Sequence, residues 1–280
     1  MPGNRHLAFL SFAVILLALA PSLSSLSAGD QKLSPEELVA EHLKSIAASG
    51  TWEQIKNRVI LGTFSVQILQ GAFGQPLCQA QIASEGRKLA IAMTCDNQQY
   101  PGEYFAFDGN SVTVGRYIRG TLSPLGEFIN RFDGLIKEGL LGGTLSLGWS
   151  LGNIAQKRPR LKYNQAKLDG RSVHELEYRP RKGLGDFKIT LYFEPETYRH
   201  IRSEYRLHIF DAIGTTDTHY ILSEAFSDFK EVDGMVLPHQ YMISFSAEGR
   251  RSTFLAHWIF NAKAWSHNGQ IDLSIFRAPE

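Results

Sequence analysis

The stretch SPLGEFINRFDGLIKEGLLGGTLSLGWSLGN, residues 123–153, interrupts a chain that otherwise alternates apolar and polar residues. Its first half repeats apolar residues at helical spacing, at Leu125, Phe128, Ile129, Phe132, Leu135 and Ile136. Its second half, from Gly139 onward, contains no charged residue. One long apolar insert in a β-rich chain predicts a segment that fills or covers a cavity of the sheet. Binding of a hydrophobic ligand is therefore the first hypothesis, ahead of catalysis.

Strand-like patterning lies on both sides of this insert. Residues 60–68 and 187–193 place apolar side chains at every second position, which is the period of a β-strand. Asp108-Gly109, Asp169-Gly170 and Asp233-Gly234 mark tight turns between such runs. We count about ten or eleven strands with short connections, a pattern typical of an antiparallel barrel or sandwich rather than of an α/β fold.

Helical segments are available to fill the concave side of such a sheet. Ser34-Pro35-Glu36-Glu37 predicts a helix start, because the serine can cap, proline suits the first helical position and Glu37 completes a capping box. Ser123-Pro124 repeats this start at the insert, and Gly142-Gly143 predicts a break or kink within it. Loose packing of the insert would open apolar ligand space against the sheet. The alternative, a permanent core segment, remains open from patterning.

Cys78 and Cys95 are the only cysteines of the chain. They flank a predicted hairpin with its turn at 85–88, and pairing Ser84 with Leu89 places the two cysteines opposite each other on one face. In an exported protein this register predicts a cross-strand disulfide. The alternative is a pair of buried free thiols.

The N-terminus has the features of a secretory signal. Arg5 and His6 precede an apolar run over residues 7–20, and small residues follow up to Ala28. We expect residues 1–28 to be a signal peptide and residues 29–280 to be a single periplasmic domain; the alternative is an uncleaved membrane anchor. Residues 29–280 hold 28 basic and 28 acidic residues, because the first 28 contain one arginine and no acid. This neutral balance argues against a nucleic-acid partner.

Motifs that would indicate catalysis are missing. There is no P-loop or dinucleotide-binding fingerprint, and the glycines around Ser146 match a nucleophile elbow only loosely. His200 and His208 lie on the polar side of one predicted strand, which is typical of a solvated face. We therefore expect no enzyme activity, no cofactor and no metal site. The basic residues of 179–182 predict a solvated loop, or alternatively a contact for anionic lipid headgroups or an acidic partner.

Three segments are informative when taken together: GTWEQIK (50–56) leading into a strand with Gly62-Thr63-Phe64; LDGRSVHEL (168–176) leading to LYFEPET (191–197); and FSDFKEVDGMVLPH (226–239). Together they resemble the outer-membrane lipoprotein-sorting, LolA-like superfamily of bacterial periplasmic proteins. The resemblance covers most of residues 34–280 and implies a mainly β (α+β) fold. That fold is a single large curved antiparallel sheet, an open half-barrel, with helices on its concave face. It also implies non-covalent capture of acyl chains from lipids or lipoproteins, and it transfers no catalytic residues.

These observations lead to one functional prediction. The protein is expected to be a periplasmic carrier that holds lipid or lipoprotein acyl chains between its curved sheet and the insert 123–153, with an envelope delivery partner as a further expectation. The alternative is a non-catalytic protein-interaction or envelope-sensor module on the same scaffold. Patterning alone selects the residues expected to line the cavity: Phe64, Met93, Phe128, Phe132, Leu135, Trp149, Leu191, Phe193, Leu207 and Phe245.

Overall fold

A computed structural model of the chain describes residues 33–69, 75–115, 121–210, 217–250 and 252–277. The predicted signal peptide, residues 1–28, lies outside the described residues. Leu33–Glu280 forms one compact unit. Within the described part of the chain, no helix combines the length and the apolar content that a membrane crossing requires.

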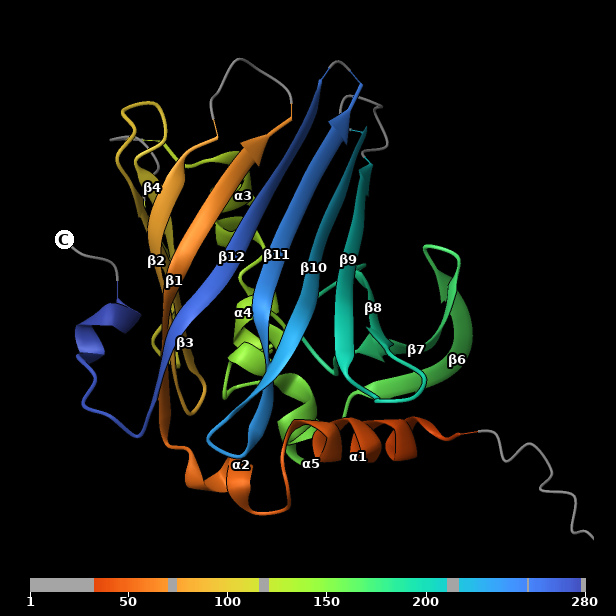
Figure 1. The fold of residues 1–280 in the computed structure, drawn as a ribbon. Coiled ribbons are helices and arrows are strands. Elements are labelled where there is room, and N and C mark those ends of the chain that lie inside the picture. Colours follow the sequence, from red (N-terminus) through yellow and green to blue (C-terminus); the bar gives the residue numbers. More distant parts are fainter. Residues whose placement is uncertain (1–32, 70–74, 116–120, 211–216, 251, 278–280) are drawn as a thin grey trace, which may run out of the picture. The chain divides into compact units, whose positions relative to one another are not determined.

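The described residues form one sheet of twelve antiparallel strands, in the order β5-β4-β3-β2-β1-β12-β11-β10-β9-β8-β7-β6 (Figure 1). Consecutive strands of the chain are neighbours in the sheet, except that β5 and β6 form its two opposite edges, and the first and last strands, β1 and β12, pair in its interior. The sequence estimate of about ten or eleven strands was therefore slightly low. The strands are β1 Asn57–Ile68, β2 Leu77–Glu85, β3 Lys88–Cys95, β4 Gly102–Phe107, β5 Val112–Val114, β6 Arg160–Leu168, β7 Arg171–Arg179, β8 Lys188–Phe193, β9 His200–Phe210, β10 Asp217–Val232, β11 Met235–Gly249 and β12 Thr253–His267.

The sheet is open, because its outermost strands β5 and β6 do not pair with each other. The insert connects these two edges and lies inside the curve of the sheet (Figure 1). This arrangement confirms the predicted fold class, a single curved antiparallel sheet with helices on its concave face. The insert contains short helical elements: α3 Pro124–Arg131, α4 Gly134–Lys137, η1 Gly143–Leu145 and η2 Ser150–Asn153. Helix α5 (Ile154–Lys157) follows it directly.

Helix α1 (Pro35–Ile46) begins as the sequence predicts. The Ser34 hydroxyl accepts from the Glu37 backbone N–H at 3.1 Å, and the Glu37 carboxylate accepts from the Ser34 N–H at 2.8 Å. The helix buries Leu38, Val39 and His42 against the rest of the unit. The other helical elements outside the insert are α2 Thr51–Gln54 and η3 Leu273–Phe276.

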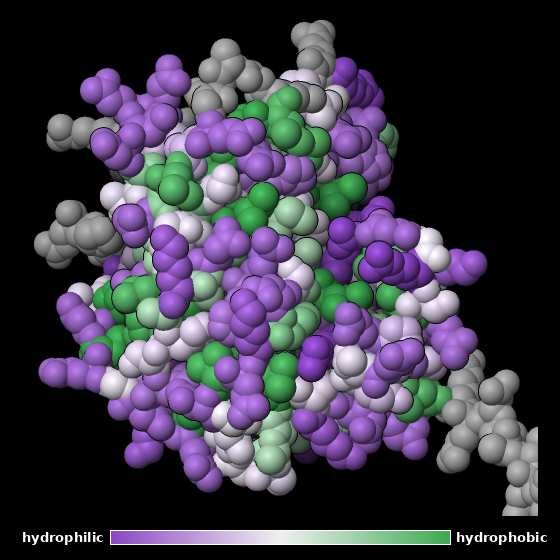
Figure 2. Space-filling view, viewed as in Figure 1, coloured by the Kyte–Doolittle hydropathy of each residue, from purple (hydrophilic) through white to green (hydrophobic). Residues whose placement is uncertain are grey.

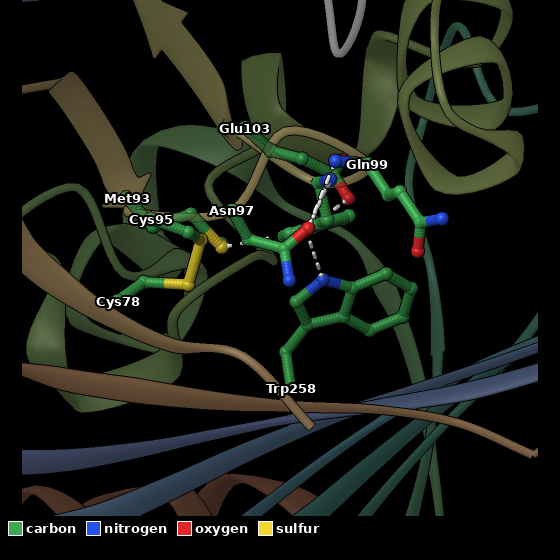
Figure 3. Close-up of a disulfide and its surroundings, with 8 residues drawn as sticks. Cys78, Met93, Cys95, Asn97, Gln99, Glu103 and Trp258 are labelled. Atoms are coloured by element: carbon green, nitrogen blue, oxygen red, sulfur yellow. Dashed lines mark hydrogen bonds between the residues drawn. A yellow bond between two sulfur atoms is a disulfide. The ribbon is translucent and has the colours of Figure 1, made fainter. Parts of the chain in front are cut away.

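The cysteine hairpin has the predicted register. Cys78 pairs with Cys95 across β2 and β3, Ser84 pairs with Leu89, and the two cysteines form a disulfide. Figure 3 shows this disulfide beside Met93. Its position ties two strands of the first half of the sheet together within the main apolar core.

The two faces of the sheet differ in polarity. Hydrophilic residues cover most of the face seen in Figure 2, with apolar residues scattered among them. On the other face, inward side chains such as Phe64, Phe193 and Phe245 have no exposed surface. The insert therefore covers the apolar side of the sheet and leaves the polar side to water.

Candidate functional site

The second half of the insert fills the concave side of the sheet. Every residue from 140 to 151 is buried, and Leu140, Leu145, Trp149 and Leu151 have no exposed surface. Gly142 and Gly143 adopt positive φ angles of 81° and 48°, which fits the break predicted there. A segment this buried must satisfy its backbone groups internally, and the sheet supplies several partners.

Glu224 of β10 fixes the centre of the insert. Its side chain is completely buried and accepts from the Gly142 N–H at 2.7 Å and from the Tyr241 hydroxyl at 2.5 Å. The Tyr205 hydroxyl lies 2.7 Å from the second carboxyl oxygen of Glu224 and 2.9 Å from the Leu140 carbonyl oxygen. Burial raises the pKa of Glu224 to about 7.

The hydrogen bonds around Glu224 also indicate that its carboxyl group is protonated, in agreement with the raised pKa. A tyrosine hydroxyl has one hydrogen to donate. Tyr205 therefore makes hydrogen bonds to both neighbours only when it donates to Leu140 and accepts from a protonated Glu224. The cluster is complete with a neutral carboxylic acid, and it loses one hydrogen bond when Glu224 ionises.

Arg58 of β1 fixes the next turn of the insert. One of its terminal amino groups donates to the carbonyl oxygens of Thr144 and Leu145, at 2.7 and 3.3 Å. Its Nε donates to Nε2 of His267, whose Nδ1 lies 2.7 Å from the Asp233 carboxylate. Desolvation lowers the pKa of Arg58 to about 9, so the buried guanidinium stays charged at neutral pH. Its charge is held by carbonyl dipoles and by the rings of Trp52 and Trp265.

Two histidines enclose Trp149. The indole N–H donates to Nε2 of His42 at 3.2 Å, and the His200 ring stacks on the indole with centroids 4.9 Å apart. Nδ1 of His42 faces the carbonyl oxygen of Tyr198 at 3.1 Å, so that nitrogen carries the hydrogen. Desolvation lowers the pKa of His42 to about 4, so the ring is neutral at physiological pH. Helix α1, through His42, and strand β9, through His200, thus contact Trp149 of the insert from two sides.

His200 corrects one sequence prediction. His208 is exposed as expected, but His200 is 1% exposed and belongs to the core. A register shift between Tyr192 and Phe193 of β8 interrupts the alternation where β8 meets β9. His200 and Ser203 consequently share the inner side despite their odd spacing, and their side chains lie 3.0 Å apart.

A third buried ionisable group, Glu103 of β4, holds the beginning of the insert. It accepts from the Tyr100 hydroxyl at 2.5 Å and from the Ser123 hydroxyl at 2.7 Å. Ser123 is also the N-cap of α3, and Tyr100 accepts from the Trp258 indole at 2.6 Å. Figure 3 shows Trp258 directed from the sheet toward the loop that precedes Glu103. Burial raises the pKa of Glu103 to about 7.

The first half of the insert is held differently. Helix α3 packs through aromatic rings: Phe128 lies 5.0 Å from Phe245 and 5.5 Å from Tyr220 between centroids. The ring centroid of Phe132 lies 5.4 Å from that of Phe187, the residue before β8. Phe132 itself is only half-buried. Among the described residues, no side-chain hydrogen bond joins residues 125–132 to the sheet. This half depends on apolar packing, whereas the second half is fixed by directional bonds.

The residues predicted to line a cavity come together in the structure, but as packed core. Nine of the ten belong to, or pack against, one apolar cluster, and Leu207 is buried outside it. Phe132 is the one that is not fully buried. Their role in ligand binding stays a prediction. Sequence reasoning did not select Arg58, Glu103 or Glu224, although each occupies an inward position of its strand, where a charged residue is unusual.

A groove of about 1030 Å³ lies beside the aromatic packing of α3. Its wall includes Leu184 and Phe187, and Phe187 also contacts Phe128 and Phe132 inside. Six cationic and two acidic side chains surround it: Arg160, Lys162, Arg179, Arg181, Lys182 and Lys188, with Glu177 and Asp186. The basic loop 179–182 noted in the sequence is therefore part of a groove whose wall combines cationic side chains with apolar ones such as Leu184 and Phe187.

Comparison with known proteins bears on the fold. No protein-family model and no curated protein matches the sequence. Among solved structures, a LolA superfamily protein from Nitrosomonas europaea is similar at 12% identity and a TM-score of 0.45, covering 88% of this chain and 98% of that one. A DUF1329 family protein from Desulfovibrio piger matches at 11% identity and a TM-score of 0.39, over 87% and 97%. MucB in complex with MucA(peri) matches at 8% identity and 0.22, over 82% and 94%.

These likenesses concern the fold alone. The fold implied by the LolA-like resemblance of three sequence segments agrees with the open curved sheet. At these identities and scores they carry no argument about what this chain binds.

Proposed function

We propose that the protein is a non-catalytic periplasmic binding protein that holds the acyl chains of lipids or lipoproteins on the concave side of its sheet. The observation that supports this most directly is the continuity between the groove and the core. Phe187 lines the groove and contacts Phe128 and Phe132 of the insert. An amphiphile needs polar contacts for its headgroup and apolar contacts for its chains, and the groove offers side chains of both kinds.

The chemistry of the groove fits an anionic headgroup. Arg181 and Lys182 lie in the loop between β7 and β8, and Lys188 lies at the start of β8. The groove has six basic and two acidic side chains, and one of the acids, Glu177, pairs with Lys162 at 3.2 Å. The basic side chains are therefore in excess. Headgroup contacts with these cationic side chains would orient the molecule, and each Å² of acyl surface buried would contribute about 25 cal/mol.

The two halves of the insert then have different roles. Residues 140–151 form a fixed floor, because Glu224, Arg58 and His42 hold them by hydrogen bonds. Residues 125–132, which pack on the sheet through aromatic rings, are the movable cover. Displacing α3 exchanges aromatic packing for acyl packing and breaks few hydrogen bonds. The sequence predicted that the whole insert covers the cavity; we now propose that role only for the part around α3.

The test is lipid extraction from protein purified under mild conditions from a bacterial periplasm, with mass spectrometry against a mock purification. We expect stoichiometric acylated molecules. Phe132→Asp should remove them, and the double variant Arg181→Glu, Lys182→Glu should reduce those with anionic headgroups. Lys44→Glu, on the exposed side of α1, is the matched charge control. Wild-type lipid content in Phe132→Asp would overturn the proposed cover.

A second candidate function is a protein-interaction or envelope-sensor module. The observation that favours it is the filled concave side, with residues 140–151 completely buried. A protein that emerges lipid-free from the same purification, remains folded and retains no added fatty acid would favour this candidate over the carrier.

A further inference from the structure

Three potential metal ligands gather at one end of β9 and β10. His208 and His219 are directly paired across the two strands, and their rings stack with centroids 3.9 Å apart. Asp217 begins β10 two residues before His219. Its Oδ1 lies 2.9 Å from Nε2 of His208 and 3.8 Å from Nε2 of His219. One ligand atom from each residue lies within 4.8 Å of the other two.

The spacing of these atoms fits a small divalent ion. Zinc binds imidazole nitrogen and carboxylate oxygen at about 2.0–2.2 Å, so the ligand atoms of a tetrahedral ion lie roughly 3.4 Å apart. The two measured distances to Asp217, 2.9 and 3.8 Å, bracket that separation. The strand pairing fixes both imidazoles on one face with the same nitrogen directed at the same oxygen. Small rotations of exposed side chains would complete the geometry.

The surroundings leave the site accessible. His208 and His219 are exposed, so an ion can enter without opening the core. Arg250 lies 3.9 Å from Asp217, but through the other carboxylate oxygen, Oδ2. Glu248 of β11 is the direct partner of His219, is exposed and occupies the same face of the sheet. Its carboxylate is not among the ligand atoms that lie within 4.8 Å of one another, so the site consists of three protein ligands.

We propose that His208, Asp217 and His219 form a binding site for a divalent transition-metal ion of the zinc type. Two imidazoles and one carboxylate suit zinc, nickel and copper better than magnesium or calcium. The bound ion would join the end of β9 to the start of β10 and thereby stabilise that hairpin. None of its three residues lines the groove or belongs to the insert, so the site does not depend on the proposed lipid binding.

The experiment is calorimetric titration of untagged, EDTA-treated protein with zinc chloride, together with thermal unfolding. We expect saturable binding of one ion and a higher Tm with zinc, which EDTA reverses. His208→Ala and His219→Ala should each weaken binding at least tenfold and abolish the Tm shift, and Asp217→Asn should weaken it less. His257→Ala is the matched control, because His257 also lies on the outer face but is paired with Ser244.

Two outcomes of the zinc titration would contradict the proposed metal site. Absence of saturable binding at millimolar zinc would mean that the cluster is only a hydrogen-bonded histidine–aspartate group. Binding that persists unchanged in the double variant His208→Ala, His219→Ala would place the ion elsewhere. Because circular dichroism of the variants reports their folding, lost binding in an unfolded variant is recognised and does not count as support.

Discussion

The Glu224 carboxyl group accepts a 2.7 Å hydrogen bond from the Gly142 N–H, and this contact joins strand β10 to the centre of the insert. The group is completely buried, and burial raises its pKa to about 7 from an ordinary 4.5. An acid whose pKa is higher in the folded state binds more protons there than in the unfolded state. Its contribution to stability is full below pH 4.5 and is lost as the pH rises through 7.

The first prediction is that Glu224→Gln stabilises the protein at alkaline pH. Glutamine resembles the protonated acid, since its oxygen can accept from Gly142 and its amide can donate to Tyr205. Wild type and variant should be similarly stable at pH 5. At pH 8 the variant should be more stable by about 1–3 kcal/mol. Urea unfolding at both pH values measures the difference.

The pH dependence of the wild-type protein alone would not isolate Glu224, because buried histidines change the stability with pH in the opposite direction. The lowered pKa of His42, about 4, means that its contribution to stability is gained as the pH rises from 4 to 6.5. This background cancels between wild type and Glu224→Gln. Glu103→Gln should behave like Glu224→Gln, because burial raises the pKa of Glu103 to about 7 as well. A stability difference that is independent of pH would contradict the protonated state of Glu224.

The second prediction concerns Arg58. Replacing it with methionine keeps much of the volume but leaves the carbonyl oxygens of Thr144 and Leu145 without their donor. Each buried unsatisfied group costs about 1–3 kcal/mol, so we expect a loss of roughly 3 kcal/mol in the free energy of unfolding. Lys44→Met, which breaks an exposed pair with Glu41, should change it by less than about 0.5 kcal/mol. Equal effects of the two variants would mean that Arg58 does not hold the insert.

Features set by local spacing could be predicted from the sequence. The Cys78–Cys95 pairing follows from the two-residue strand period and a short turn, and the start of α1 follows from Ser34 and Glu37. The helical half of the insert and its glycine break were visible in the same way. In each case the determining residues lie within about 20 positions of one another, so backbone geometry alone relates them.

The attachment of the insert could not be predicted in the same way. Glu224 and Gly142 are 82 residues apart, and Arg58 and Thr144 are 86 apart. Only the folded sheet brings them together. One signal was available: Glu224 alternates in phase with the buried Leu222 and Phe226, so its side chain had to face inward. A buried charge needs partners, which indicates a contact without naming it.

The third prediction concerns the disulfide. Replacing both Cys78 and Cys95 with alanine removes a link between residues 17 positions apart, which the loop-entropy model values at about 3 kcal/mol. The β1–β2 and β3–β4 pairs remain, so circular dichroism should still report a sheet. The urea midpoint should fall, and dithiothreitol should lower that of the wild type but not that of the variant. A wild-type midpoint unaffected by complete reduction, verified by thiol alkylation, would contradict this.

The fourth prediction is that Phe132 and Leu135 differ in their contribution to stability, although the sequence analysis expected both to line the same cavity. Leu135 has no exposed surface, so Leu135→Asp buries a carboxylate among apolar side chains and should lower the free energy of unfolding by about 4 kcal/mol or more. Phe132 is half-buried at the edge of the aromatic packing, so aspartate there can reach water. Phe132→Asp should cost about 1–2 kcal/mol and leave a folded protein. Urea unfolding followed by tryptophan fluorescence, to which the buried Trp149 and Trp258 contribute, measures both free energies. If Phe132→Asp proves as damaging as Leu135→Asp, α3 is part of the permanent core and cannot be the movable cover.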